Sequence, residues 1–123
     1  MKYIHTDKAP KVVGPYSQAI DTGEFVFLSG QIGIDPKTGE LAKGTVGQLE
    51  QVMKNIGKVL EASGCALSHV VKTTIFLAHM SEYQQVNEAY GKYFSKHKPA
   101  RSTVEVSNLP KGALIEIEAI AVK

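Results

Sequence analysis

The chain contains a single cysteine, Cys65, no tryptophan, and no long apolar run. One cysteine excludes an internal disulfide and is typical of proteins in a reducing compartment. A membrane-spanning helix needs about 20 consecutive apolar residues, and no segment approaches that length. The N-terminal segment MKYIHTDKAP also lacks the apolar core of a secretory signal. These absences predict a cytoplasmic protein without membrane contact, in which Cys65 is a small buried hydrophobe.

The chain also has little excess charge and no grouped metal ligands. Fourteen lysines and arginines stand against twelve aspartates and glutamates, which gives a net charge of +2. Nucleic-acid-binding proteins usually carry a concentrated basic patch, so this balance argues against such a partner. The four histidines are scattered, without the His-Glu-x-x-His or paired-cysteine spacing of metal sites. We therefore expect neither a metal ion nor another cofactor.

The length and composition predict one globular domain over residues 1–123, since 43% of the residues are hydrophobic and 21% are charged. Segment 18–35, QAIDTGEFVFLSGQIGID, predicts two strands around a turn at residues 21–24. The following DPKTGE, with its proline and glycine, predicts a second turn. Three strands in all are expected before the first helix.

Two segments have the apolar spacing of amphipathic helices. The first spans residues 44–64, with Thr45 and Gln48 as a capping box and Gly64 just beyond its end. The second spans residues 81–94 and begins with a similar pair at Ser81 and Gln84. The expected buried stripes are Val46, Leu49, Met53, Ile56 and Leu60 on the first helix, and Tyr83, Val86, Tyr90 and Phe94 on the second.

Three further strands are predicted at SHVVKTTIFL, RSTVEV and ALIEIEAIAV. The resulting order, β-β-β-α-β-α-β-β, is typical of an α+β fold in which a mixed six-stranded sheet carries two helices on one face. The last strand places small and aliphatic residues on one side, and Leu114, Glu116, Glu118 and Ile120 on the other. A face that frames two carboxylates with aliphatic side chains suggests a partly buried subunit interface.

Arg101, in KPARSTVEV, begins a strand and has no acidic neighbour in the sequence. It is either an exposed residue at a strand end or an anchor for a carboxylate or phosphate, which the planar guanidinium binds well. Glu116 is likewise either a solvated strand carboxylate or a catalytic group. Because only SNLPKGA joins their strands, antiparallel pairing would place the two residues on neighbouring strands of one sheet.

Six motifs together resemble the Rid family of reactive intermediate deaminases, in particular its RidA subgroup. They are GPYSQA, LSGQIG, DPKTG, VNEAY, PARSTVEV and LPKGALIEIEAIA, and they follow one another along essentially the whole chain. The resemblance implies a chorismate-mutase-like α+β fold and a homotrimer whose sheets form a central β-barrel. It also implies an active site in each cleft between subunits.

The activity that this resemblance implies is hydrolysis of 2-imino acids, chiefly 2-iminobutanoate and 2-iminopropanoate, to 2-oxo acids and ammonia. These imines are by-products of pyridoxal-phosphate-dependent dehydratases. Arg101 matches the carboxylate-binding arginine and Glu116 the glutamate that orients water. Tyr16, Ser29 and Asn87 match residues that line the pocket.

Thr103 departs from the family pattern, because many RidA-like sequences have cysteine there. The resemblance implies that this position contributes to substrate binding mainly through its backbone, which a threonine preserves, although it removes any role for a thiol.

Three other readings remain open on the sequence. The trimer could bind small carboxylates as a sensor without turnover, using the same Arg101. It could bind or cleave RNA, although aromatic and basic residues are not interleaved. It could also act as a chaperone-like interaction protein, which would require a sizeable exposed apolar patch.

Overall fold

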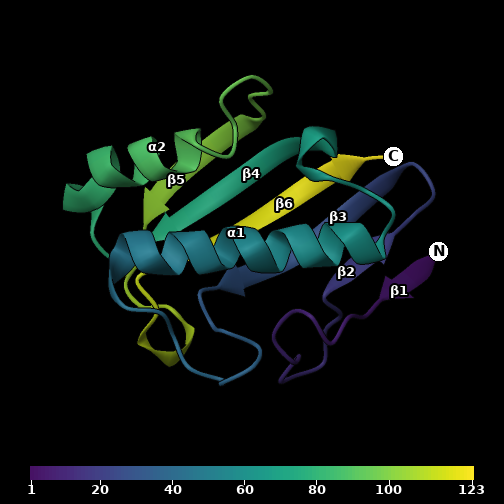
Figure 1. Cartoon of the computed structure of the whole chain (residues 1–123), viewed down its shortest axis with the longest axis horizontal. Helices are drawn as coiled ribbons and strands as arrows, with labels where there is room; N and C mark the ends of the chain where they lie inside the picture. Colours follow the sequence, from purple (N-terminus) through teal and green to yellow (C-terminus); the bar gives the residue numbers. More distant parts are fainter.

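The computed structural model describes residues 1–123 and consists of one six-stranded sheet with both α-helices on the same side (Figure 1). The helices are α1 (Gly44–Ala62) and α2 (Tyr83–Gly91). The strands are β1 (Lys2–Ile4), β2 (Ala19–Asp21), β3 (Phe25–Ile32), β4 (Val70–Leu77), β5 (Ala100–Glu105) and β6 (Ile115–Val122). Short 3-10 helices, η1 to η3, span Leu67–His69, Met80–Glu82 and Pro110–Gly112. The predicted element order is confirmed. Three strands precede the first helix, because the N-terminal β1 adds to the two strands predicted in segment 18–35.

The strands lie side by side in the order β1-β2-β3-β6-β4-β5. All neighbouring pairs are antiparallel except β4 and β5, which run parallel. The prediction that β5 and β6 are neighbours is therefore wrong, because β4 separates them. The physical reason is the β4-α2-β5 connection, since a helix between two strands returns the chain in the same direction and pairs them in parallel. The last strand then inserts between β3 and β4.

The start of each helix differs from the prediction. Thr45 does not cap α1, which begins one residue earlier, and its hydroxyl instead donates to the carboxylate of Glu82 at 2.8 Å. Ser81 lies in η2 and makes no cap on α2. Both capping boxes are thus wrong, because tertiary contacts and a 3-10 turn occupy these positions.

The end of α1 is as predicted. Gly64 adopts a positive φ of 77°. The N–H groups of Gly64 and Cys65 bond the carbonyls of Glu61 and Leu60, which closes the helix in a Schellman motif. Cys65 is buried, in agreement with its predicted packing role.

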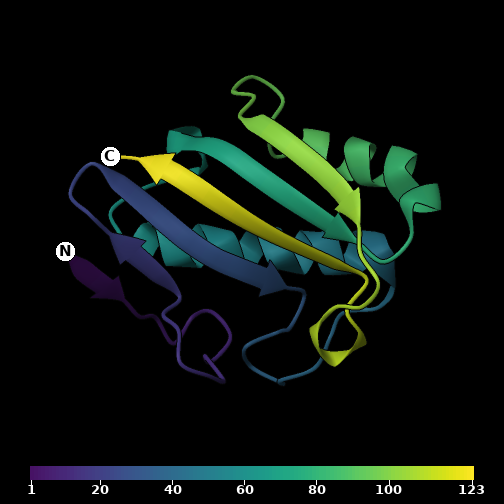
Figure 2. The same cartoon turned by 180° about the vertical axis from the view of Figure 1, so that it is seen from behind.

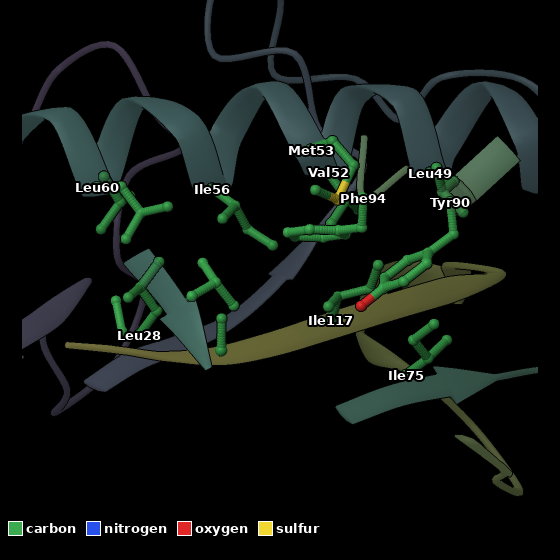
Figure 3. Close-up of a cluster of buried hydrophobic side chains, with 14 of the residues drawn as sticks. Leu28, Leu49, Val52, Met53, Ile56, Leu60, Ile75, Tyr90, Phe94 and Ile117 are labelled. Carbon is green, nitrogen blue, oxygen red and sulfur yellow. The ribbon is translucent and has the colours of Figure 1, made fainter. Parts of the chain in front are cut away.

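The core lies between the sheet and the two helices (Figure 3). The side of β6 that carries Ile115, Ile117, Ala119 and Ala121 is buried there, as predicted. Val52 and Val59 widen the buried face of α1 beyond the predicted stripe. Val46 and Tyr83 were expected in the buried stripes but are 38% and 39% exposed, because each lies in the first turn of its helix, beyond the packed centre.

No helix covers the opposite face of the sheet, which Figure 2 shows with both helices behind it. Phe25 and Phe27 point to this open face and are 39% and 45% exposed. Glu118 on β6 lies there too. Neighbouring aromatic side chains that are exposed on one face of a sheet typically mark a surface that contacts another molecule. No helix of the structure is long and apolar enough to cross a membrane.

Candidate functional site

The carboxylate of Glu116 lies in a pocket of about 110 Å³. The pocket is bounded by the loop that precedes β2, by the second half of β3, and by η3. The residues that line it are Pro10, Lys11, Val12, Val13, Tyr16, Gln18, Gly30, Gln31, Ile32, Ile34, Pro110, Lys111 and Glu116. The structure thus brings together two predicted site residues, Tyr16 and Glu116, which are far apart in the sequence but line one cavity.

Glu116 is half-buried and packs closely against the backbone of Gly30. A Cβ atom added at Gly30 would lie 2.6 Å from Oε2 of Glu116, so only glycine leaves room for the carboxylate. Burial raises the pKa of Glu116 above its ordinary value of 4.5, and the negative charge of Glu118 raises it further. The pocket therefore holds a carboxyl group that keeps its proton to a higher pH than an exposed carboxyl group does.

Gln18, which the sequence reasoning missed, fixes the wall of the pocket. It is 2% exposed, and its side-chain oxygen accepts the N–H of Thr6 at 2.7 Å. Its side-chain nitrogen donates to the carbonyls of Thr6 and Pro10. The polar side chain at the end of GPYSQ, next to Tyr16, was the signal that could have identified it.

Ser29 lies directly before Gly30, at the irregularity where the register of β3 against β6 shifts. Its hydroxyl donates to the carbonyl of Ser17 at 2.6 Å, and its N–H donates to the carbonyl of Gln18. Ser29 therefore joins the segment that carries Tyr16 to the strand that carries Gly30, and acts on the shape of the pocket.

Arg101 lies elsewhere, on the helix-covered side of edge strand β5. Its Nη2 donates to Oδ1 of Asn87 at 2.7 Å and to the hydroxyl of Tyr83 at 3.0 Å. Its guanidinium carbon is 5.0 Å from the ring centroid of Tyr90, within cation–π range. Tyr90 is itself held by a hydrogen bond of 2.7 Å between its hydroxyl and that of Thr73. The arginine is thus fixed before any ligand binds, and its partners are neutral.

Within one chain, Arg101 and Glu116 do not meet. Arg101 lies beside Thr73 of β4, and Glu116 lies beside Phe76 of the same strand. Because side chains alternate along a strand and these two positions are three apart, Arg101 and Glu116 lie on opposite faces of the sheet. Strand geometry puts their Cα atoms roughly 14 Å apart. The predicted site residues therefore form two groups, one around Glu116 and one around Arg101.

Thr103 follows Arg101 on the same side of β5, and its hydroxyl is buried without a hydrogen-bond partner. A buried, unpaired hydroxyl costs stability, whereas valine has nearly the same shape and no polar group. We expect Thr103→Val to raise the melting temperature by about 4 °C, corresponding to about 1 kcal/mol. Thermal unfolding followed by circular dichroism measures this effect.

The matched control is Thr73→Val, because Thr73 is buried but its hydroxyl is bonded to Tyr90. We expect this variant to melt at a lower temperature than the parent. A lower melting temperature for Thr103→Val as well would contradict the prediction, since it would mean that the Thr103 hydroxyl has a partner in solution.

A second pair of variants separates activity from stability. Gly30→Ala pushes the carboxylate of Glu116 aside, and displacements of about 1 Å in an active site can cost roughly 10²-fold in rate. Gly33→Ala instead clashes with the backbone of Gln48 at 2.7 Å. We expect Gly30→Ala to lose turnover but keep its melting temperature, and Gly33→Ala to unfold at a lower temperature. Equal melting losses in both variants would contradict this assignment.

The Endoribonuclease L-PSP family matches residues 6–123, and the chain belongs to this family. It is 55% identical over 121 residues to a RutC family protein of Pyrococcus horikoshii, covering 98% of this chain and 96% of that protein. It is 47% identical over 123 residues to the 2-iminobutanoate/2-iminopropanoate deaminase of Mus musculus, covering 99% of this chain and 91% of that protein.

Among solved structures, RidA from an Antarctic Psychrobacter superposes with a TM-score of 0.97 at 45% identity, and the match covers 100% of both chains. The resemblance to the Rid family that six motifs indicated is thereby confirmed. The α+β fold with a mixed six-stranded sheet and two helices is confirmed as well.

Proposed function

We propose that this protein is an enzyme that hydrolyses small 2-imino acids, 2-iminobutanoate and 2-iminopropanoate, to 2-oxo acids and ammonia. The names of its deaminase relatives support this activity, as does the chemistry of Arg101 and Glu116. The substrate is a small carboxylate, for which a fixed guanidinium is a suitable anchor. Its place is the cytoplasm, where dehydratases that use pyridoxal phosphate would release these imines.

The separation of Arg101 from Glu116 within one chain bears on where the complete site lies. A small imino acid cannot contact both residues across roughly 14 Å and two faces of a sheet. A complete site therefore needs Arg101 of one subunit beside Glu116 of the next. The uncovered face with Phe25 and Phe27 supports association of several copies. We propose a homotrimer of the chorismate-mutase-like type, in which three sheets enclose a central β-barrel and three sites lie between subunits.

In the proposed reaction, Arg101 holds the substrate carboxylate and thereby places the imine carbon beside a water molecule. Glu116 accepts a proton from this water as the water oxygen bonds to the imine carbon, and the electron pair of the C=N double bond moves to the nitrogen, which takes that proton from Glu116. Glu116 then accepts the hydroxyl proton of the resulting amino alcohol and passes it to the nitrogen, as the C=O bond forms, the C–N bond breaks and ammonia leaves. Imines also hydrolyse unaided, so each tenfold gain requires about 1.4 kcal/mol of barrier lowering.

The remaining site residues have supporting roles in this proposal. Tyr16 borders the pocket beside Glu116 and offers a hydroxyl to the substrate. Ser29 shapes the pocket, and Asn87 orients Arg101. Thr103 contributes its backbone next to the carboxylate, because it lies two residues beyond Arg101 on the same side of β5.

A trap competition tests the activity. An amino-acid oxidase generates 2-iminobutanoate in the presence of semicarbazide, and the protein is added at increasing dose. We expect the wild type to suppress semicarbazone formation, and Arg101→Ala and Glu116→Gln not to do so. A folded wild type that leaves trapping unchanged would overturn the enzyme proposal and favour a carboxylate sensor.

Mixed assemblies test where the site lies. Arg101→Ala and Glu116→Gln chains are unfolded, mixed in equal amounts and refolded together. If each site takes one residue from each of two chains, random assembly restores both residues in about a quarter of the sites. We therefore expect about a quarter of the wild-type activity. Mixtures as inactive as the separate variants, although mass spectrometry shows mixed trimers, would contradict a shared site.

Because the family is described as an endoribonuclease, RNA cleavage is tested as well. The same preparation is incubated with single-stranded RNA over a range of salt concentrations. The near-balanced charge predicts weak RNA binding, and the proposed deaminase activity predicts no RNA cleavage. Cleavage that Glu116→Gln leaves intact would show a separate ribonuclease activity.

A further inference from the structure

Tyr83, at the start of α2, carries a hydroxyl that is hydrogen-bonded to the guanidinium of Arg101. The side chain is 39% exposed, and its oxygen accepts a hydrogen bond of 3.0 Å from Nη2 of Arg101. The same nitrogen donates to Oδ1 of Asn87 at 2.7 Å, in a partly buried position. Sequence reasoning assigned Tyr83 to the buried stripe of the helix, so no ligand role was expected for it.

The hydrogen-bond count at Arg101 shows what remains for a ligand. A guanidinium has five N–H groups, and the two on Nη2 are taken by Tyr83 and Asn87. The N–H of Nε and the two of Nη1 have no partner in the structure. Each Nη2 hydrogen points into one of the two forks of the guanidinium, one shared with Nη1 and one shared with Nε. The oxygen of Tyr83 therefore occupies one half of a fork whose other half is free.

We propose that Tyr83 is a substrate-binding residue that completes the carboxylate site of Arg101. One carboxylate oxygen accepts the free N–H of the fork, and the other accepts the hydroxyl proton of Tyr83. The hydroxyl can do both, because it accepts from Nη2 with a lone pair and donates its own proton. This inference rests on the proposed function. It adds a second, neutral donor, the hydroxyl of Tyr83, for the other oxygen of the substrate carboxylate.

Phenylalanine at position 83 separates this role from packing. The guanidinium carbon is 5.7 Å from the ring centroid of Tyr83 and 5.0 Å from that of Tyr90, so both rings help to hold the arginine. Tyr83→Phe keeps the ring and removes the hydroxyl alone. Asn87 and Tyr90 remain to fix the orientation of Arg101.

The experiment measures binding and turnover separately. Calorimetric titration with 2-oxobutanoate, the stable product, gives a Kd for the assembled wild type and for Tyr83→Phe, and steady-state assays give KM and kcat. We expect Kd and KM to rise about fivefold, as for the loss of one hydrogen bond to a charged group at an exposed site, and kcat to change less than twofold. Tyr3→Phe, on the far edge strand, is the control and should match the wild type.

An unchanged Kd for Tyr83→Phe would overturn the proposal, as would a lower kcat with unchanged Kd and KM. These outcomes are distinct from a failure of the proposed function, which would show as a wild type without turnover. The titration still reports on Tyr83 in that case, because 2-oxobutanoate binding requires no reaction.

The pH dependence of binding provides a second readout that a packing role would not affect. Hydrogen bonding with Asn87 and the charge of Arg101 lower the pKa of Tyr83. Ionisation removes the donated proton and adds a negative charge, so Kd for 2-oxobutanoate should rise at alkaline pH in the wild type.

The same rise should be smaller in Tyr83→Phe, and identical pH profiles would overturn the proposal. Other ionisable groups near Tyr83 are engaged elsewhere. Glu82 accepts from Thr45, Glu105 accepts the N–H of Met80, and the hydroxyl of Tyr90 is bonded to Thr73.

Discussion

Glu116→Gln is expected to lower kcat by roughly 10²- to 10³-fold, the usual loss when a general base is removed. Glutamine has the same size and fills the same space against Gly30, but it cannot accept a proton from water. Binding of the substrate carboxylate depends on Arg101 and should survive, so the Kd for 2-oxobutanoate should change less than twofold. Steady-state kinetics and calorimetric titration measure the two effects. A variant that keeps its kcat would remove Glu116 from the reaction.

The dependence of activity on pH gives a second test of the role of Glu116. Because burial and Glu118 raise the pKa of Glu116 above 4.5, activity should fall on the acid side at a pH above that value. Glu118→Gln should move this limb to lower pH, whereas Glu24→Gln, in the turn before β3, should not move it. An unchanged profile for Glu118→Gln would contradict the proposed coupling of the two carboxylates.

The raised pKa also has a consequence for stability. The folded protein holds the proton of Glu116 more tightly than the unfolded chain does, so this group's contribution is fully present below pH 4.5. That contribution is lost as the pH rises through the raised value. Glu116→Gln removes this dependence and should melt no lower than the wild type at neutral pH.

Arg101→Ala is expected to raise KM and the Kd for 2-oxobutanoate roughly 10²-fold, because the charge-assisted hydrogen bond to the carboxylate and the positive charge beside it are both lost. Arg101→Lys should recover only part of this loss, since an ammonium keeps the charge but not the planar fork. Lys37→Ala, in the exposed turn at residues 35–40, is the matched loss of a positive charge and should behave as the wild type.

Unchanged binding by a folded Arg101→Ala variant with the oligomeric state of the wild type would show that another cation holds the carboxylate. The pocket around Glu116 offers Lys11 and Lys111 for that role. Lys111 has a positive φ of 58°, which is uncommon for a residue other than glycine. Alanine at each of these positions would then identify the anchor.

The sequence alone determined which side of each strand is buried. Alternation along ALIEIEAIAV assigned Ile115 and Ile117 to the core and Glu116 to the other face, because side chains alternate along a strand. The positive φ of Gly64 at the end of α1 could also be predicted, since few other residues adopt it at low cost. The family motifs predicted Arg101 and Glu116 as site residues, and the variants proposed above test that prediction.

Only the tertiary structure decided how these residues are arranged. The short link between the last two strands suggested that they pair, yet β6 lies between β3 and β4, while β5 pairs with β4 in parallel. Sequence patterns report the period within an element, and strand order depends on contacts between elements far apart in the chain. For the same reason, Gln18 as a wall of the pocket and Tyr83 as a partner of Arg101 emerged only from the folded chain.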